Sequence, residues 1–274
     1  MSLAAPVTEA KPLVAAAAVS NLATDEGYAA ILDVLRTEAH SFVRSTAVYY
    51  LRHFRTKARK DIWPVVEEML ADKDPEVARW ALRLMVEDSA PAVQGGYAKL
   101  DDTLRKILAS GSSELRAYAL NHVREWAETD PQKARAWLPL VRPLVETADP
   151  RVRYDAIHTT LVLLDKGQLD FLRQAYEKDK DPLVREGILR CVTVIPEPPV
   201  EAIELFILGL DADDAKVRET AAKLLAKGCK QYFPYDPQGE ADQRQAGVEK
   251  WTQWYQANRA KLQWEPDLRK FLLP

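Results

Sequence analysis

The sequence predicts an all-α protein, an α–α superhelix built from stacked pairs of helices. The first observation is a short phrase, Asp149-Pro150-Arg151-Val152-Arg153, which recurs with variations along the 274 residues. The second is that its copies follow one another at near-constant spacing. The third is composition: 10 glycines and few β-branched runs argue against a β-rich fold, and 47% hydrophobic residues can bury a continuous core.

The recurring phrase indicates the start of a helix. Its Asp caps free backbone amides, its Pro fits the first helical position, where no N–H is needed, and its Val begins a buried stripe. Asp181-Pro182-Leu183-Val184-Arg185 is nearly the same phrase, and Asp74-Pro75-Glu76-Val77-Ala78 lacks only the arginine. The second half of the phrase recurs at residues 41–44, 113–116 and 215–218.

The spacing of the phrase predicts the repeat. Its apolar residue, the anchor, falls at Val43, Val77, Leu115, Val152, Val184 and Val217, in steps of 34, 38, 37, 32 and 33 residues. Such steps are typical of paired-helix repeats. A small or apolar residue follows each anchor after four positions, which indicates a helix packed closely against another helix.

An amphipathic first helix precedes each of these second helices. We expect first helices over residues 28–35, 62–70, 100–108, 134–145, 169–176 and 200–210, which gives about six helix pairs. Pro64, Pro139 and Pro143 should kink these helices or mark their first turns.

Three segments follow from this pattern. Residues 1–24 form an N-terminal segment with a capping helix over 11–22, residues 25–230 form the repeats, and residues 231–274 form an aromatic C-terminal cap. The cap is expected to contain a long helix that covers the open edge of the last repeat, as repeat arrays need for solubility. This helix carries Val248, Trp251, Trp254, Tyr255 and Leu262, and Trp264 and Phe271 follow it.

The Asp-Pro-x-Val-Arg phrase with Ala four residues after Val resembles the HEAT-repeat family. This armadillo-like family includes the HEAT-like repeats named after phycobilisome lyases, and the resemblance covers residues 25–228. It implies a ladder of Asp and Arg side chains between adjacent repeats, carried here by Asp149/Arg153, Asp181/Arg185 and Asp213/Arg218. It does not select a function, because the family contains scaffolds, lyases and DNA glycosylases.

The C-terminal segment is similar to the terminal segment of many environmental-bacterial HEAT proteins, which are often exported. Met1-Ser2-Leu3 has the character of a cloning remnant, so a signal peptide could precede Ala4 in the native gene. We therefore favour a periplasmic or secreted bacterial protein over a cytoplasmic one.

Composition and motifs weigh against several classes of function. Lys and Arg number 38 against 41 Asp and Glu, so a nucleic-acid binder is disfavoured. No stretch approaches the ~18 apolar residues of a membrane span. Cys191 and Cys229 lie outside any CxxC pair, and we expect two buried thiols. No metalloprotease, nucleophile-elbow, P-loop or dinucleotide motif occurs, so we expect no enzyme and no catalytic, cofactor or metal site.

A binding surface is the better hypothesis. In such solenoids the second helices line the concave surface, and positions two, three and six after the anchor face away from the core. The residues expected to bind a partner there are Tyr49, Arg79, Trp80, Arg83, Tyr118, Asn121, Tyr154, His158 and Arg190. Arg, Tyr and Trp are enriched at binding hot spots. The competing interpretation is that the aromatics pack on neighbouring helices and the charges only solvate the face.

These observations favour a non-enzymatic scaffold that binds a protein or peptide on its concave face. The alternative is a DNA-binding protein resembling the HEAT-like alkylpurine DNA glycosylases, and a bilin lyase ranks last. Residues 52–60 hold five basic side chains and no acid, so they could contact phosphate or an acidic partner. A solvated connector between helices is the simpler interpretation of that stretch.

Overall fold

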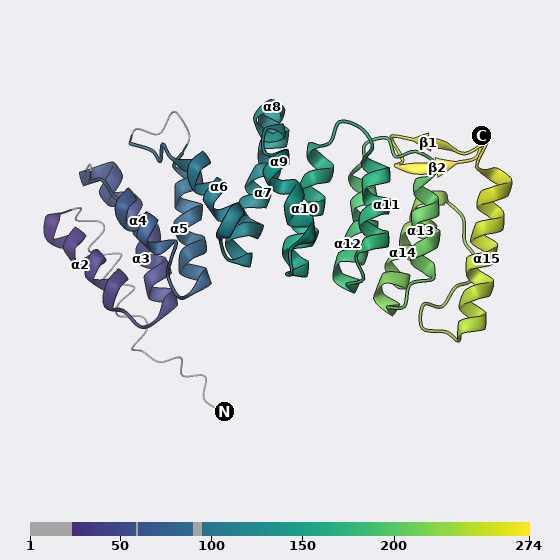
Figure 1. The fold of residues 1–274 in the computed structure, drawn as a ribbon, viewed down its shortest axis with the longest axis horizontal. Helices are drawn as coiled ribbons and strands as arrows, with labels where there is room; N and C mark the ends of the chain where they lie inside the picture. The colour runs from purple at the N-terminus through teal and green to yellow at the C-terminus, as the bar shows by residue number, and fades with distance from the viewer. Residues whose placement is uncertain (1–23, 59, 90–94) are drawn as a thin grey trace. The chain divides into compact units, whose positions relative to one another are not determined.

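The structure is a computed structural model, and it describes residues 24–58, 60–89 and 95–274 (Figure 1). The chain divides into two compact units, unit 1 over Met1–His122 and unit 2 over Val123–Pro274. The capping helix expected over 11–22 falls outside the described residues, so it stays a prediction. So do the segment boundaries after residues 24 and 230.

Unit 1 contains successive helix pairs. They are α2 (Asp25–Thr37) with α3 (Ser41–Ala58), α4 (Trp63–Met69) with α5 (Pro75–Glu87), and α6 (Leu100–Ser110) with α7 (Ser113–Thr129), which continues into unit 2. The small residues that follow the anchors lie in the core, since Ala47, Ala81 and Ala119 are each 0% exposed. Their size lets the backbones of paired helices approach closely. Pro64 lies in the first turn of α4.

Unit 2 continues the same arrangement. Its first pair joins α8 (Pro131–Arg135), α9 (Leu138–Val141) and the 3₁₀ helix η1 (Arg142–Glu146) to α10 (Pro150–Leu163). The next pair joins α11 (Gln168–Lys178) to α12 (Pro182–Cys191), which η2 (Val192–Val194) extends. The last pair is α13 (Ala202–Leu210) with α14 (Ala215–Cys229). The described residues thus contain six helix pairs, and the predicted all-α class of paired helices is confirmed.

The prediction of a single continuous first helix is wrong for one of the pairs. Residues 134–145 were expected to form one helix, and the structure divides them among α8, α9 and η1. Pro139 and Pro143 each lie in the first turn of a new piece. Proline lacks the N–H that would continue the preceding helix, so each one begins a new piece instead of kinking a continuous helix.

The recurring phrase begins helices as predicted. Asp74, Asp149 and Asp181 cap α5, α10 and α12, and each accepts hydrogen bonds from amides of the first turn. The Asp149 carboxylate lies 2.8 Å from the Arg151 amide nitrogen. At α14 the capping residue is Asp214, which accepts from the amides of Lys216 and Val217.

The arginine of the phrase binds different partners from those that the family resemblance implied. Arg153 forms a two-point ion pair with Asp179, two residues before the next phrase, with nitrogen–oxygen distances of 2.6 and 3.2 Å. Arg185 donates to the Asp179 carbonyl oxygen. Arg218 donates to the carbonyl oxygens of Ala212, Asp213 and Pro237. The acidic partner of Arg153 is therefore Asp179, while Asp149 and Asp181 cap helices and Asp213 contributes its backbone oxygen.

The C-terminal segment packs on the last helix pair. Helix α15 (Ala241–Asn258) contacts α13, and its Trp251 and Tyr255 are 2% and 4% exposed. The Tyr255 hydroxyl donates to Glu204 of α13 at 2.8 Å. The helix ends before Leu262, contrary to the prediction. A hairpin of β1 (Gln263–Glu265) and β2 (Lys270–Leu272) follows, pairs Trp264 with Phe271, and contacts α14 through β2.

The structure also bears on the two cysteines and on the length and hydropathy of the described helices. Cys191 and Cys229 are free and buried, as predicted. None of the helices among the described ranges is both long enough and apolar enough to cross a membrane.

Candidate interaction surface on the second helices

The predicted binding residues of unit 1 lie on α3, α5 and the first part of α7. Tyr49 is 39% exposed, and Arg79, Arg83 and Asn121 are exposed as well. Trp80 and Tyr118 are half-buried. The side of each second helix away from the core is therefore accessible, as the spacing from the anchor predicted.

Two aromatic rings and two arginines of unit 1 form a contiguous group, which we call the aromatic–arginine cluster: Tyr49 and Arg52 on α3, and Trp80 and Arg83 on α5. The rings of Tyr49 and Trp80 meet edge to face, with centroids 6.0 Å apart. The Arg83 guanidinium lies 4.8 Å from the Trp80 ring centroid, and that of Arg52 lies 5.1 Å from the Tyr49 centroid. Both distances are in the range of cation–π attraction.

Two glutamates of α5 hold this cluster in place. Glu76 accepts from the Trp80 indole N–H at 2.9 Å and also binds Arg79. Glu87 accepts from Arg83 at 2.5 Å and from Arg52 at 2.6 Å. Burial raises the pKa of Glu87, but the hydrogen bonds from the two arginines outweigh it and lower the pKa overall. The carboxylate stays ionised near neutral pH, so it fixes the two guanidinium groups over their rings.

The predicted residues of unit 2 form a second aromatic contact. The rings of Tyr154 and His158 on α10 are stacked with centroids 6.1 Å apart. Both side chains are half-buried. The Tyr154 ring lies directly on Gly187 of α12, because a Cβ placed on that glycine would be 2.3 Å from a ring carbon. The Tyr154 ring can therefore pack against α12 at this point because Gly187 has no side chain.

Burial and nearby charges shift the pKa values of His158 and of the neighbouring Asp155. Arg124 donates to Thr159 at 2.9 Å and lies 3.4 Å from the Asp155 carboxylate. Burial, and secondarily Arg124, lowers the pKa of His158. Burial raises the pKa of Asp155, and Arg124 opposes that rise. His158 is consequently neutral near pH 7, so the positive charge on this side of unit 2 comes from Arg and Lys.

Arg190 lies in a small ion-pair group between α12 and α14. Its guanidinium binds Glu186 at 2.6 Å, and the same carboxylate is 3.4 Å from the Lys216 ammonium and 3.2 Å from the Thr220 hydroxyl. The Glu186 side chain is 13% exposed, whereas Arg190 is 62% and Lys216 is 73% exposed. The acid is buried beneath its cations, which point to solvent.

The surface cavities of unit 2 contain structural ion pairs. One of 430 Å³ is lined by η1, the start of α10 and the end of α11, and Arg153 and Asp179 of the ladder form part of its wall. Another, of 350 Å³, is lined by Arg173, which is bound to Glu204 at 2.5 Å. Within the described ranges, no group of three or more His, Cys, Asp or Glu side chains could hold a metal ion. The surface of the second helices is therefore the better candidate site.

Sequence reasoning did not identify the residues that organise this surface. Glu76, Glu87 and Arg52 complete the aromatic–arginine cluster, and Gly187 seats Tyr154. A signal was present for the two glutamates, since Glu76 precedes Trp80 by four residues and Glu87 follows Arg83 by four. Side chains at this spacing lie next to each other on a helix. Arg52 and Gly187 act across helices, and the register between helices is not apparent from spacing within one helix.

Comparison with known proteins supports the repeat assignment. The family model of HEAT repeats matches residues 102–192, which run from α6 to η2. The search of curated proteins gave no match. A solved structure, described as the crystal structure of an engineered protein, is 19% identical in sequence, with a TM-score of 0.39. The matched region covers 87% of this chain and 73% of the engineered chain.

The match to the family model confirms the predicted HEAT repeats over residues 102–192. It includes three of the anchors, Leu115, Val152 and Val184, and the helix pairs before and after it repeat the same arrangement of helix start and buried alanine. HEAT repeats commonly serve as scaffolds for protein interaction and are generally not enzymes.

Proposed function

We propose that this protein is a non-enzymatic scaffold whose second helices bind a protein or peptide partner, and that the aromatic–arginine cluster of unit 1 is a principal contact. The observation that carries the proposal is that Tyr49, Trp80, Arg83 and Arg52 form one group at the surface, two rings each paired with a guanidinium. Tyr49 and Arg83 are exposed, and Trp80 and Arg52 are half-buried.

The energetics of recognition support this choice of contact. Tyr, Trp and Arg are enriched at binding hot spots. Tyr and Trp combine a large contact area with few freely rotating bonds. The carboxylates of Glu76 and Glu87 already fix Trp80 and Arg83 in the free protein. A partner then binds side chains that have lost much of their freedom beforehand, so less conformational entropy opposes binding.

The cluster does not have the character of a hydrolytic or group-transfer site. Its carboxylates are bound to arginines and to an indole N–H, and the described part of the cluster contains no histidine or cysteine in contact with them. General acid–base catalysis needs a group within hydrogen-bond reach of the substrate and free to exchange its proton. Binding is therefore the role that these side chains favour.

The test is selection of peptides on the purified protein. A displayed library of random peptides, each of about 12 residues, is selected against the full chain. Enriched peptides are synthesised, and their dissociation constants are measured by fluorescence polarisation for the wild type and for Trp80→Ala. We expect Trp80→Ala to weaken binding by about 30-fold, the effect of a hot-spot residue that contributes about 2 kcal/mol.

Tyr232→Ala is the matched control. Tyr232 is 75% exposed on the C-terminal segment of unit 2, so its removal deletes an accessible aromatic ring outside the cluster. Thermal unfolding followed by circular dichroism verifies that both variants are folded. Peptides that bind Trp80→Ala as tightly as the wild type, or a library that yields no enriched peptide, would refute the proposal.

A further inference from the structure

The second helices of unit 2 carry a strong excess of basic residues. Helices α10, α12 and α14 together hold eight Arg and Lys against three Asp and Glu. The first helices of the same three pairs, which are α8, α9 and η1 together, α11 and α13, hold five against four. The chain as a whole has a net charge of −3. Positive charge is thus concentrated on one set of helices.

The accessible part of this charge lies on one side of each helix. Lys216, Lys223 and Lys227 of α14 are exposed and follow one another at steps of seven and four residues, which places them on one face. Arg190 of α12 and Arg151 of α10 are exposed too. We call these five side chains the basic face.

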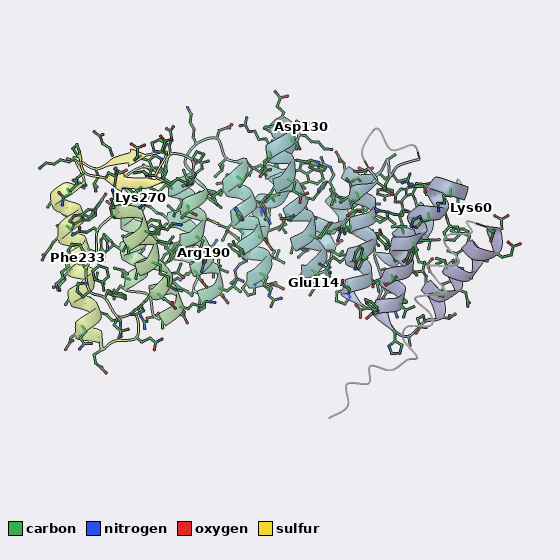
Figure 2. All side chains as sticks on the ribbon, turned by 180° about the vertical axis from the view of Figure 1, so that it is seen from behind. Lys60, Glu114, Asp130, Arg190, Phe233 and Lys270 are labelled. Carbon is green, nitrogen blue, oxygen red and sulfur yellow. The ribbon has the colours of Figure 1, made fainter. Side chains whose placement is uncertain are left out.

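Contacts between the helices place these residues on a common surface. Helix α12 packs against both α10 and α14. Glu186 of α12 touches Lys216 and Thr220 of α14, and Tyr154 of α10 rests on Gly187 of α12. The same sides of neighbouring helices therefore adjoin. Figure 2 draws these side chains and labels Arg190.

The acids on this surface leave it positive. Glu186 is largely buried beneath Arg190 and Lys216, and Glu219 pairs with Lys223. Even so, the side chains of Lys216 and Lys223 are 73% and 72% exposed. Two acids against five exposed cations leave the basic face with unbalanced positive charge.

An apolar side chain accompanies the cations. Leu183 is 44% exposed in the first turn of α12, seven residues before Arg190 and so on the same side of that helix. An aliphatic side chain on the same side of the helix as an exposed cation matches a partner segment that joins acidic residues to an apolar one.

We propose that the basic face binds an acidic segment of a partner protein, with an apolar residue of that segment packed on Leu183. The inference rests on the proposed function as a scaffold, but it concerns unit 2 and does not involve the aromatic–arginine cluster. A protein segment fits better than a nucleic acid, because evenly spaced phosphates would meet the carboxylate of Glu219, which is 48% exposed. A peptide can place its acids opposite the lysines and a neutral residue opposite Glu219.

The experiment uses three fluorescein-labelled peptides of about 12 residues, enough to cross three helices spaced about 9 Å apart. One contains Glu and Leu, the second has Gln in place of Glu, and the third has Lys in place of Glu. Binding to the full chain is measured by fluorescence polarisation at about 50 mM and about 300 mM NaCl. A labelled DNA duplex with the same net charge as the acidic peptide is measured in parallel.

We expect only the acidic peptide to bind, and its dissociation constant should rise about tenfold at the higher salt because exposed charges are screened. Lys216→Glu with Lys223→Glu should weaken binding about tenfold or more. Lys178→Glu with Lys180→Glu is the matched control, since it makes the same change in net charge at the end of α11 and in the turn that follows. Leu183→Ser should weaken binding of the acidic peptide without altering its dependence on salt.

Three results would overturn the inference. The first is that the acidic and the neutral peptides bind equally. The second is that the control double variant loses as much binding as the test variant, because net charge alone would then act. The third is that the duplex binds more tightly than the acidic peptide through Lys216 and Lys223. Trp80→Ala separates the two proposals, since it should leave binding of the acidic peptide unchanged whatever it does to peptides selected from the library.

Discussion

Gly187 of α12 has no Cβ, and the ring of Tyr154 from α10 fills the space that one would occupy. The three atoms nearest to such a Cβ all belong to Tyr154, at 2.3, 2.4 and 3.2 Å. Gly187→Ala therefore has two opposed effects. Alanine favours the helix by about 1 kcal/mol relative to glycine, whereas forcing the ring from a packed seat costs about 2 kcal/mol. We expect the variant to be less stable by about 1 kcal/mol.

The sign should reverse when Tyr154 is removed. In a Tyr154→Ala background the obstructing atoms are absent, so Gly187→Ala should stabilise the protein by about 1 kcal/mol. The coupling between the two sites is then about 2 kcal/mol, well above the error of a double-mutant cycle. Urea unfolding followed by circular dichroism gives the four free energies, and hydrogen exchange of the α12 amides localises the change.

Gly228→Ala in α14 is the control for this cycle. No atom lies within 4 Å of a Cβ placed there, so its effect should be the same with or without Tyr154. If Gly187→Ala changes stability by the same amount in both backgrounds, Tyr154 does not rest on Gly187. The common surface of α10 and α12 that supports the basic face would then lose one of its contacts.

Two further predictions concern titratable groups. Burial raises the pKa of Asp72, but the hydrogen bonds from Arg44 and the Asp74 amide lower it overall, below 3.8. The Arg44–Asp72 ion pair therefore stabilises the fold above pH 3.8, and this stabilisation is lost as the pH falls through the lowered pKa. Urea unfolding across this range should show that the free energy of unfolding of Asp72→Asn approaches that of the wild type in acid. Burial raises the pKa of Cys191 and Cys229 to about 12, so both thiols should resist Ellman's reagent at about pH 8 until urea unfolds the chain; rapid reaction of the native protein would contradict their burial.

The fold could be predicted largely because local chemistry and the repeat agree. Asp and Pro begin a helix for reasons contained in a few adjacent residues, and the caps Asp74, Asp149 and Asp181 lie where the phrase placed them. The alanine four residues after the anchor marks the side of the helix that touches its partner. Repetition of both signals fixes the pairing of helices without any knowledge of long-range contacts.

The errors arise where distant parts of the chain determine the structure. The hairpin at residues 263–272 was not predicted, and it is positioned by β2 against α14 and by Arg269, which donates to the Thr193 carbonyl oxygen. Asp179 rather than Asp149 binds Arg153, because the turn before α12 lies beside the start of α10. No spacing within one repeat contains that information.

The surface was predicted as a set of positions, and its chemistry required the structure. The rule of two, three and six residues after the anchor found Tyr49, Trp80 and Arg83, whose exposure follows from helical geometry alone. Each guanidinium lies over a ring three residues away on its own helix. The contact between the Tyr49 and Trp80 rings and the sharing of Glu87 between Arg52 and Arg83 depend on how α3 packs against α5. Whether these residues bind a partner stays a prediction until the peptides are tested.

Net charge is a poor guide to the partners of a protein built from helix pairs. First and second helices face different sides of a pair, so an excess of one sign on one set can be cancelled by the other in the total. In unit 2 the second helices hold eight basic residues against three acidic ones, although the chain is slightly negative. The balanced total therefore does not by itself argue against a polyanion. The stronger argument is local: the accessible carboxylate of Glu219 lies among the exposed lysines, where a peptide can avoid it and a regular phosphate backbone cannot.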